Sequence, residues 1–188
     1  MTSTSLRRAL YVLFGRLLAG ELSPELYGRL RAGGLDDLAR TQGVDLVSDL
    51  LDAEDPDSAA VELAAEHARL TERVSLLASE YSEATDDAVV ALDAFLREHE
   101  LLLLNEVPLP HDHLSVVLGV MGELAQREED AAADEDATCH ARAFFLRHVN
   151  AWAPRALTEI SAHADRRFYR GVATMLSAFL ASERQHYS

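Results

Sequence analysis

The sequence predicts an all-α fold, a single-domain bundle of about eight to ten helices that takes in residues 1–188. Three observations predict it. Apolar residues recur with the period of an α-helix along the chain, and no segment alternates apolar and polar residues as a half-buried strand would. Serine–proline and aspartate–proline pairs also stand where helices are expected to begin. A chain of 188 residues is long enough for one domain with a substantial core.

Residues 5–20 predict a first amphipathic core helix, although the pair Arg7–Arg8 followed by apolar residues superficially resembles a twin-arginine export signal. Arg16 interrupts the apolar run, and no small-residue cleavage site follows, so we read this segment as a helix. All three arginines are expected away from the centre of its apolar stripe. The stripe consists of Leu6, Leu10, Leu13, Phe14, Leu17 and Leu18.

Two further helix starts follow in the first half of the chain. Ser23 and Pro24 supply an N-cap and a proline at the first helical position, and this short helix is expected to end at Gly33–Gly34. A weakly patterned stretch precedes Asp55–Pro56, which opens a long helix. Its apolar candidates are Val61, Leu63, Ala64, Ala68, Leu70, Val74 and Leu77.

The middle of the chain contains the main interruption. Thr85 starts a helix, and the two prolines in residues 105–110 must break regular structure, which makes this segment a possible hinge. The next helix is expected to begin near His111–Asp112, with Asp112 as a favourable cap. Because a hinge permits helix exchange, the protein is expected to be a monomer or a helix-exchanged dimer.

The last part of the chain predicts three helices. Residues 127–137 are charged and alanine-rich and are read as a solvated loop. Asp136 is expected to cap the helix that follows, and Pro154 to start another. The final helix has the core candidates Phe168, Val172, Leu176, Phe179 and Leu180.

The charge balance excludes several classes of partner. The chain has 32 acidic residues against 17 basic ones, all of them arginine, and a formal net charge of −15. Such a field repels phosphate backbones and anionic lipid surfaces, so no nucleic acid partner is expected. No apolar run reaches the roughly 18 residues of a spanning helix, so we expect no stable membrane insertion and a soluble, intracellular protein. The lysine-free acidic composition also suggests the hypothesis of a halophilic source.

The residues give little support for catalysis or for metal binding. The single cysteine, Cys139, excludes a disulfide framework and a CxxC site, and we read it as buried or incidental. A di-metal bundle needs two Glu-x-x-His pairs, but only Glu183 with His186 fits that spacing. No nucleophile elbow, phosphate loop or dinucleotide turn is present. We therefore expect a binding protein rather than an enzyme, with no cofactor and no metal.

Two segments, 109–113 and 148–154, each combine histidine and proline with an acidic or aromatic residue, a combination that an ordinary surface helix does not require. In residues 109–113 a rigid proline turn presents an acid and two imidazoles near a helix start. In residues 148–154, His148 and Trp152 stand four positions apart, so their rings are expected to stack on one helix face before Pro154. Either segment alone is compatible with an ordinary junction or a packed core pair.

Together and in this order, the two segments resemble motifs of the TorD/DmsD (NarJ-like) family of redox-enzyme maturation chaperones. A third likeness is the final helix, Phe168 to Leu180, and a fourth is the stretch Glu66 to Leu70. The chain departs from the family pattern at two places. Leu109 stands where the family has a glutamate, and Ser79–Ser82 is at best a remnant of a Pro-Tyr/Trp-Glu-Ser segment.

The resemblance implies a cytoplasmic chaperone for an apo-molybdoenzyme of the dimethyl-sulfoxide, trimethylamine-oxide or nitrate reductase type. It implies binding of the client's twin-arginine signal peptide, help with molybdopterin insertion and delayed export. In such a site Leu109 and Pro110 would shape the peptide groove, Asp112 would pair with a client arginine and His113 would form hydrogen bonds nearby. The residues expected to support that surface from behind are His148, Trp152 and Pro154.

Three alternatives stay open at this point. The first is a chaperone that grips its client outside the signal peptide. The second is a helical metal-binding or oxidoreductase bundle, and the third is a helical regulatory module that binds a small molecule.

Overall fold

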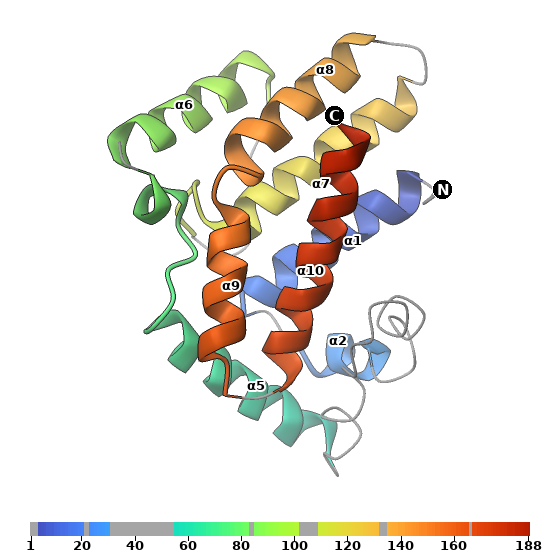
Figure 1. Ribbon diagram of the computed structural model, residues 1–188. Coiled ribbons are helices and arrows are strands. Elements are labelled where there is room, and N and C mark those ends of the chain that lie inside the picture. Colours follow the sequence, from blue (N-terminus) through green and yellow to red (C-terminus); the bar gives the residue numbers. More distant parts are fainter. Residues whose placement is uncertain are drawn as a thin grey trace. The chain divides into compact units, whose positions relative to one another are not determined.

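All regular structure in the described residues is helical, which confirms the predicted fold class. The computed structural model describes residues 4–20, 23–30, 55–82, 85–101, 109–131, 135–165 and 167–188. Eight α-helices lie in these ranges, together with the 3₁₀ helix η2 (Ala78–Tyr81) and the π-helix η3 (Phe145–Val149) (Figure 1). The α-helices are α1 (Thr4–Leu18), α2 (Pro24–Arg29), α5 (Pro56–Thr71), α6 (Thr85–Glu98), α7 (Leu114–Asp130), α8 (Glu135–Phe144), α9 (Ala153–His163) and α10 (Arg167–His186).

The chain divides into two compact units. The first unit consists of Met1–Arg16, Leu76–Pro154 and Tyr187, and the second of Leu17–Ser75, Arg155–His186 and Ser188. The expectation that residues 1–188 form one domain stays a prediction.

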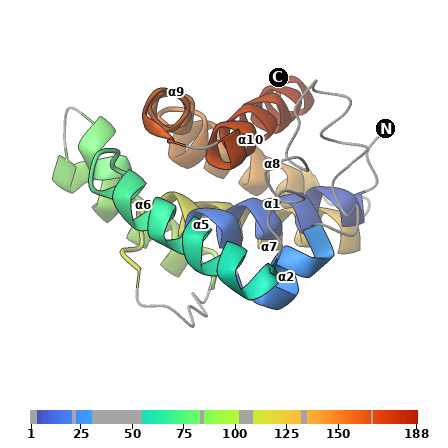
Figure 2. The ribbon, with the colours of Figure 1, turned by 90° about the horizontal axis from the view of Figure 1, so that it is seen from below.

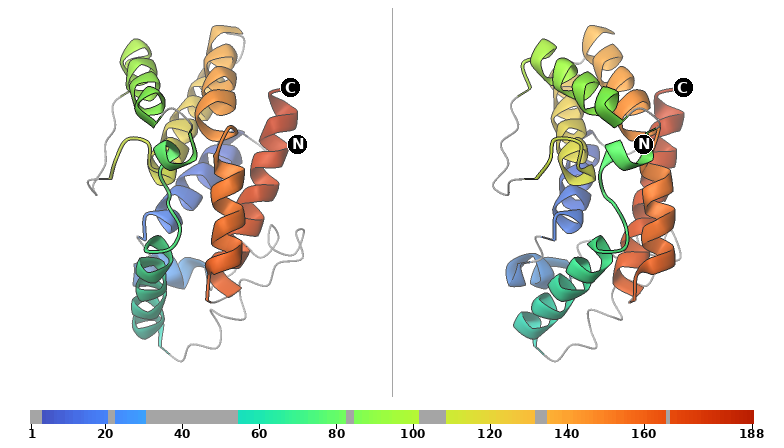
Figure 3. Two further views of the ribbon diagram at one scale, coloured as in Figure 1. Left: turned by 60° about the vertical axis from the view of Figure 1, so that its left-hand side comes forward. Right: turned by 90° about the vertical axis from the view of Figure 1, so that its left-hand side faces the viewer.

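Helix α7 is the central element of the first unit. Nine of its residues are buried, and it packs against α8 and η3, while α6 packs against η2. Figure 3 shows α6, α7 and α8 side by side in green, yellow and orange. Helix α1 crosses α7 (Figure 2). The two helices meet at small residues: a Cβ atom added at Gly122 would lie 3.3 Å from the Val12 side chain, and one added at Gly15 would lie 3.1 Å from the Ser115 carbonyl. Glycine at both positions therefore permits the close approach of the two helices.

Arg7 is buried rather than set away from the apolar stripe of α1, so that expectation was wrong. The residue is 7% exposed, and its Nη1 atom lies 3.1 Å from Glu128 Oε2. It also donates a 2.6 Å hydrogen bond to the Tyr187 hydroxyl, which itself donates to Glu128 Oε2 at 2.9 Å. Leu6, by contrast, is 47% exposed. The helical pattern mispredicted Arg7 because it treats an arginine as exposed. Here the Glu128 carboxylate and the Tyr187 hydroxyl contact the guanidinium, so its burial leaves no isolated charge.

The second unit confirms the two helix starts predicted from proline. Ser23 caps α2 by accepting the Leu26 amide at 3.1 Å, and the Asp55 carboxylate accepts the amides of Asp57 and Ser58 at the start of α5. Helices α2 and α5 pack together.

The length and core face of α5 differ in part from the expectation. The helix ends at Thr71, so Val74 and Leu77 lie beyond it. Val61 is 69% exposed and does not belong to the core, whereas Leu63 and Leu70 are buried as expected.

Three other boundaries can be compared with the sequence. Helix α7 begins at Leu114 with His113 as its N-cap, so the expected cap by Asp112 was wrong. Helix α8 begins at Glu135, which places Asp136 inside its first turn rather than at the cap. Pro154 is the second residue of α9, as predicted. The glycine stop at 33–34, the stretch that precedes Asp55 and most of the possible hinge at 105–110 lie outside the described residues.

None of the helices in the described ranges combines the length and the apolar character that crossing a membrane requires.

Candidate functional site

The segment before η2 runs antiparallel to the segment before α7. The Ala78 amide donates to the Asp112 carbonyl at 3.0 Å, and the Leu114 amide donates to the Leu76 carbonyl at 2.8 Å. The Asp112 carboxylate accepts the Ser79 amide through Oδ2 at 3.0 Å. Asp112 is 4% exposed, so this carboxylate is a buried anchor for the first turn of η2. Segment 109–113 therefore holds the first turn of η2 in place and also supplies the N-cap of α7.

Tyr81, the last residue of η2, places its ring against Trp152. The ring centroids are 5.7 Å apart and the planes lie 24° apart, a stacked arrangement. The Trp152 indole N–H donates a 2.7 Å hydrogen bond to the His148 carbonyl. The expected stack of the His148 and Trp152 rings was therefore wrong. The Trp152 ring stacks on Tyr81 instead, and its contact with His148 is the hydrogen bond to the backbone carbonyl.

The His148 imidazole is buried between aromatic rings of α6 and α8. Its centroid lies 5.8 Å from that of Phe95 and 4.9 Å from that of Phe144, and the side chain is 7% exposed. Burial lowers the pKa of His148 to about 4, and the neighbouring Arg147 charge adds to that effect. The imidazole is therefore neutral at pH 7. Its Nε2 atom is buried and has no hydrogen-bond partner in the part of the chain that the structure describes.

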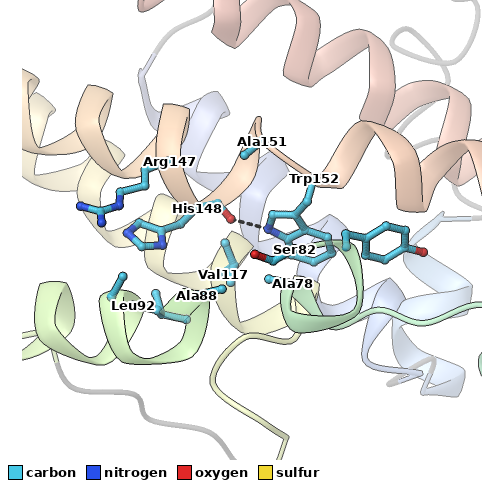
Figure 4. A pocket seen from close by; sticks show the side chains of 11 residues that line it. Ala78, Ser82, Ala88, Leu92, Val117, Arg147, His148, Ala151 and Trp152 are labelled. Atoms are coloured by element: carbon cyan, nitrogen blue, oxygen red, sulfur yellow. Dashed lines mark hydrogen bonds between the residues drawn. The ribbon is translucent and has the colours of Figure 1, made fainter. Parts of the chain in front are cut away.

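These groups line a pocket of about 330 Å³ in the first unit (Figure 4). Its walls are mainly apolar, with the Trp152 indole at one end and the His148 ring along the same side (Figure 4). Within the described part of the chain, none of the lining residues is acidic. The lining residues are Ala78, Tyr81, Ser82, Ala88, Ala91, Leu92, Val117, Arg147, His148, Ala151 and Trp152. A concave apolar site with a few polar groups is the usual form of a ligand pocket.

Among the described residues that line the pocket, none is a residue predicted for peptide binding. Those residues belong to segment 109–113, which contacts η2 and precedes α7. Leu109 is half-buried and Pro110 is exposed. Asp112 does not line the pocket itself but contacts η2, which does, by accepting the Ser79 amide. The His113 ring accepts the Ser115 amide at 3.2 Å through Nδ1 and thereby caps α7.

The residues predicted to support that surface are placed differently. His148 and Trp152 line the pocket, and Pro154 follows in the first turn of α9. Their role behind the binding surface stays a prediction, and the side chains of His148 and Trp152 border the pocket.

Sequence reasoning missed Tyr81, Ser82 and Arg147 as pocket residues. A signal for the first two was present, because Ser79–Ser82 stands where the resembling family has an aromatic residue and a serine. Arg147 had no such signal, since an arginine on an amphipathic helix is ordinary.

Metal ligation finds little support in the described residues. They contain no group of three or more histidine, cysteine, aspartate or glutamate side chains that could hold a metal ion. His99 and His140 have ring centroids 4.1 Å apart, but two imidazoles alone do not make up a usual zinc or iron site. Cys139 is exposed and not in a disulfide, so it is not a buried core cysteine.

Comparison with known proteins adds a family match and two named relatives. The family model described as nitrate reductase delta subunit matches residues 33–158, a range that includes every pocket-lining residue. The chain is similar to chaperone protein TorD of Shewanella sp. (strain ANA-3) and to that of Shewanella sp. (strain MR-4), each with 29% identity over 98 residues. The match covers 50% of this chain and 43% of each relative, so the chain matches less than half of their length.

Proposed function

The chain belongs to the nitrate reductase delta subunit family, and from this premise we propose that it is a chaperone for the maturation of a redox enzyme. The resemblance to TorD/DmsD chaperones that the sequence indicated is thereby confirmed. The proposed role is binding rather than catalysis. We place it in the cytoplasm, where an apo-enzyme awaits its cofactor.

The client we propose is an apo-molybdoenzyme, bound at its twin-arginine signal peptide. Binding there would hold the enzyme back from export while molybdopterin is inserted. The observation that carries the proposal is the apolar, aromatic pocket of about 330 Å³, which lies within the range matched by the family model. An apolar peptide segment that folds as a helix buries its anchor side chains in such a pocket.

We propose that the apolar part and the arginine pair of the signal peptide bind to different parts of the surface. The described residues of the pocket wall include Arg147 and are otherwise mainly apolar, so the wall suits the apolar part of the peptide. The arginine pair is complemented by the acidic remainder of a chain whose net charge is −15. Leu109 and Pro110, which are half-buried and exposed, remain the proposed peptide contacts of segment 109–113.

Asp112 contributes to peptide binding in this proposal by holding η2 in place. Its carboxylate is buried and already accepts the Ser79 amide, and η2 carries Tyr81 into the pocket wall. His113 holds the start of α7 in the same way. Pairing of Asp112 with a client arginine would require this carboxylate to become accessible.

The test uses Trp152, the one tryptophan of the chain, as an intrinsic reporter of pocket occupancy. Titration with a synthetic twin-arginine leader peptide should change its fluorescence with saturation. A leader whose apolar residues are replaced by serine is the matched control and should bind much more weakly. Equal responses to the two peptides, or none to either, would contradict signal-peptide binding at the pocket.

A second candidate keeps the chaperone role but places the client contact outside the signal peptide. Among the described residues that line the pocket none is acidic, and this favours the second candidate, because an arginine pair finds no carboxylate among them. Capture of a molybdoenzyme client with and without its leader separates the two. Equal capture would favour the second candidate, and loss of capture without the leader would favour the first.

The metal-binding alternative is tested by elemental analysis of the purified protein. We expect no stoichiometric metal. One equivalent of bound iron or zinc would contradict a role confined to client binding.

A further inference from the structure

One residue of the pocket wall carries a buried polar atom that has no hydrogen-bond partner within the described residues. This atom is Nε2 of His148. A buried hydrogen-bonding atom without a partner destabilises the folded chain, and a ligand that supplies the partner removes that cost on binding. The same residue could be phenylalanine if it served only to fill space between Phe95 and Phe144. His148 therefore points to a ligand with a polar group at this depth.

The space next to His148 fits a flat ring. Four alanines line the pocket and leave room where larger side chains would close it: Ala78, Ala88, Ala91 and Ala151. The indole of Trp152 provides an aromatic face, and Leu92 and Val117 provide apolar contacts (Figure 4). An aromatic ring that enters here gains both burial and ring packing.

Arg147 adds a positive charge at the same wall. Its side chain is exposed, and it has no ion-pair or hydrogen-bond partner in the described ranges. In a chain with a net charge of −15, a guanidinium beside an apolar pocket is unusual, because nearby acids are plentiful. A carboxylate on the ligand would find in it a bidentate partner.

We propose that the pocket binds a tyrosine side chain of the client peptide, with its hydroxyl hydrogen-bonded to His148 Nε2 and a neighbouring acidic residue of the peptide paired with Arg147. This inference rests on the proposed peptide-binding function and names the chemistry of the bound segment. The phenol donates its proton to the Nε2 lone pair, which is available when the imidazole is neutral and carries its proton on Nδ1. The low pKa of His148, about 4, keeps the ring neutral at physiological pH.

The experiment uses alanine-rich probe peptides of about 14 residues, long enough for marginal helicity, with one tyrosine and one glutamate four positions apart. The matched probes replace tyrosine by phenylalanine or glutamate by glutamine, and none contains tryptophan. Fluorescence of Trp152 reports binding to the full chain. We expect the tyrosine probe to bind about three- to tenfold more tightly than the phenylalanine probe, the effect of one hydrogen bond.

Three variants assign that preference to residues. In His148→Phe the preference for tyrosine over phenylalanine should vanish, while the fold is kept because the replaced ring has a similar size and no orphan nitrogen. In Arg147→Gln the preference for glutamate over glutamine should vanish. Arg142→Gln, which removes the same charge from α8 outside the pocket wall, should leave both preferences unchanged.

Absence of the tyrosine preference in the wild-type chain, or its persistence in His148→Phe, would overturn the inference. If His148→Phe does not fold, the wild-type preference and the Arg147→Gln comparison decide it. Failure here is distinguishable from failure of the proposed function. A chain that binds the leader peptide but does not discriminate among the probes contradicts only this inference, and one that discriminates but captures no client contradicts only the proposed function.

Discussion

The rings of Tyr81 and Trp152 stack with their centroids 5.7 Å apart. One ring comes from η2 and the other from the turn before α9, and both line the same pocket. Asp112 completes the arrangement from a third segment, because its carboxylate holds the Ser79 amide at the start of η2. Three segments of the chain are thus coupled at one site, and substitutions in any of them should alter it.

Replacement of Tyr81 by alanine should remove one wall of the pocket. We expect a loss of about 1–2 kcal/mol in the free energy of unfolding, from the ring pair and its burial. Trp152 emission should shift to longer wavelength because the indole becomes exposed to water. Fluorescence and urea denaturation measure the two effects. Tyr81→Phe, which keeps the ring, should leave the emission unshifted, and an unshifted emission in Tyr81→Ala would contradict the stack.

Asp112→Ala should leave the buried Ser79 amide without its acceptor. The expected loss in the free energy of unfolding is about 1–3 kcal/mol, and affinity for a leader peptide should fall with it. Asp112→Asn keeps an acceptor oxygen and is the control, with a smaller loss in both quantities. Urea denaturation and peptide titration provide the measurements. An alanine variant with wild-type stability and affinity would remove Asp112 from the support of η2.

The adjacent pair Arg7 and Arg8 provides a matched comparison within one turn of α1. Arg7 is buried against Glu128 and Tyr187, and Arg8 is exposed. Arg7→Ala leaves the carboxylate of Glu128 buried without its cation, for which we expect a loss of about 3–5 kcal/mol in the free energy of unfolding. Arg8→Ala should change it by less than about 0.5 kcal/mol. Similar values for the two variants in urea denaturation would contradict a structural role for the buried pair.

The His148 pKa predicts how stability depends on pH. Because burial lowers this pKa from 6.5 to about 4 in the folded chain, the unfolded chain binds more protons between those values. The contribution of neutral His148 to the free energy of unfolding is therefore complete above pH 6.5 and decreases as the pH falls toward 4. His67 also has a pKa lowered by burial, so the wild type must be compared with His148→Phe at each pH.

The quantity to measure is the difference in the free energy of unfolding between the wild type and His148→Phe, obtained by urea denaturation between pH 7.5 and about 4.5. We expect the wild type to lose stability relative to the variant as the pH decreases. A difference that stays constant over this range would show that His148 titrates normally.

Several features of the fold could be predicted from the sequence because their causes lie within a few residues. Ser23 and Asp55 cap the helices that follow them, and Pro154 stands in the first turn of α9, since capping and proline geometry are local properties. The helical period likewise placed Leu10, Phe14, Leu63 and Phe168 in the core. The order of the segments at 109–113 and 148–154 was enough to indicate the family.

Tertiary structure decided what those segments do. The partner of Asp112 is an amide in η2, the ring against Trp152 is that of Tyr81, and the partners of Arg7 are Glu128 and Tyr187. No periodic pattern carries this information, because each contact joins groups that are distant in the sequence and meet only when the helices pack. The sequence by itself therefore determined an all-α fold and the family, from local propensity and the order of motifs. Packing alone decided that an orphan imidazole, a guanidinium and an aromatic wall share one pocket, because burial and hydrogen-bond partnership are properties of the assembled core.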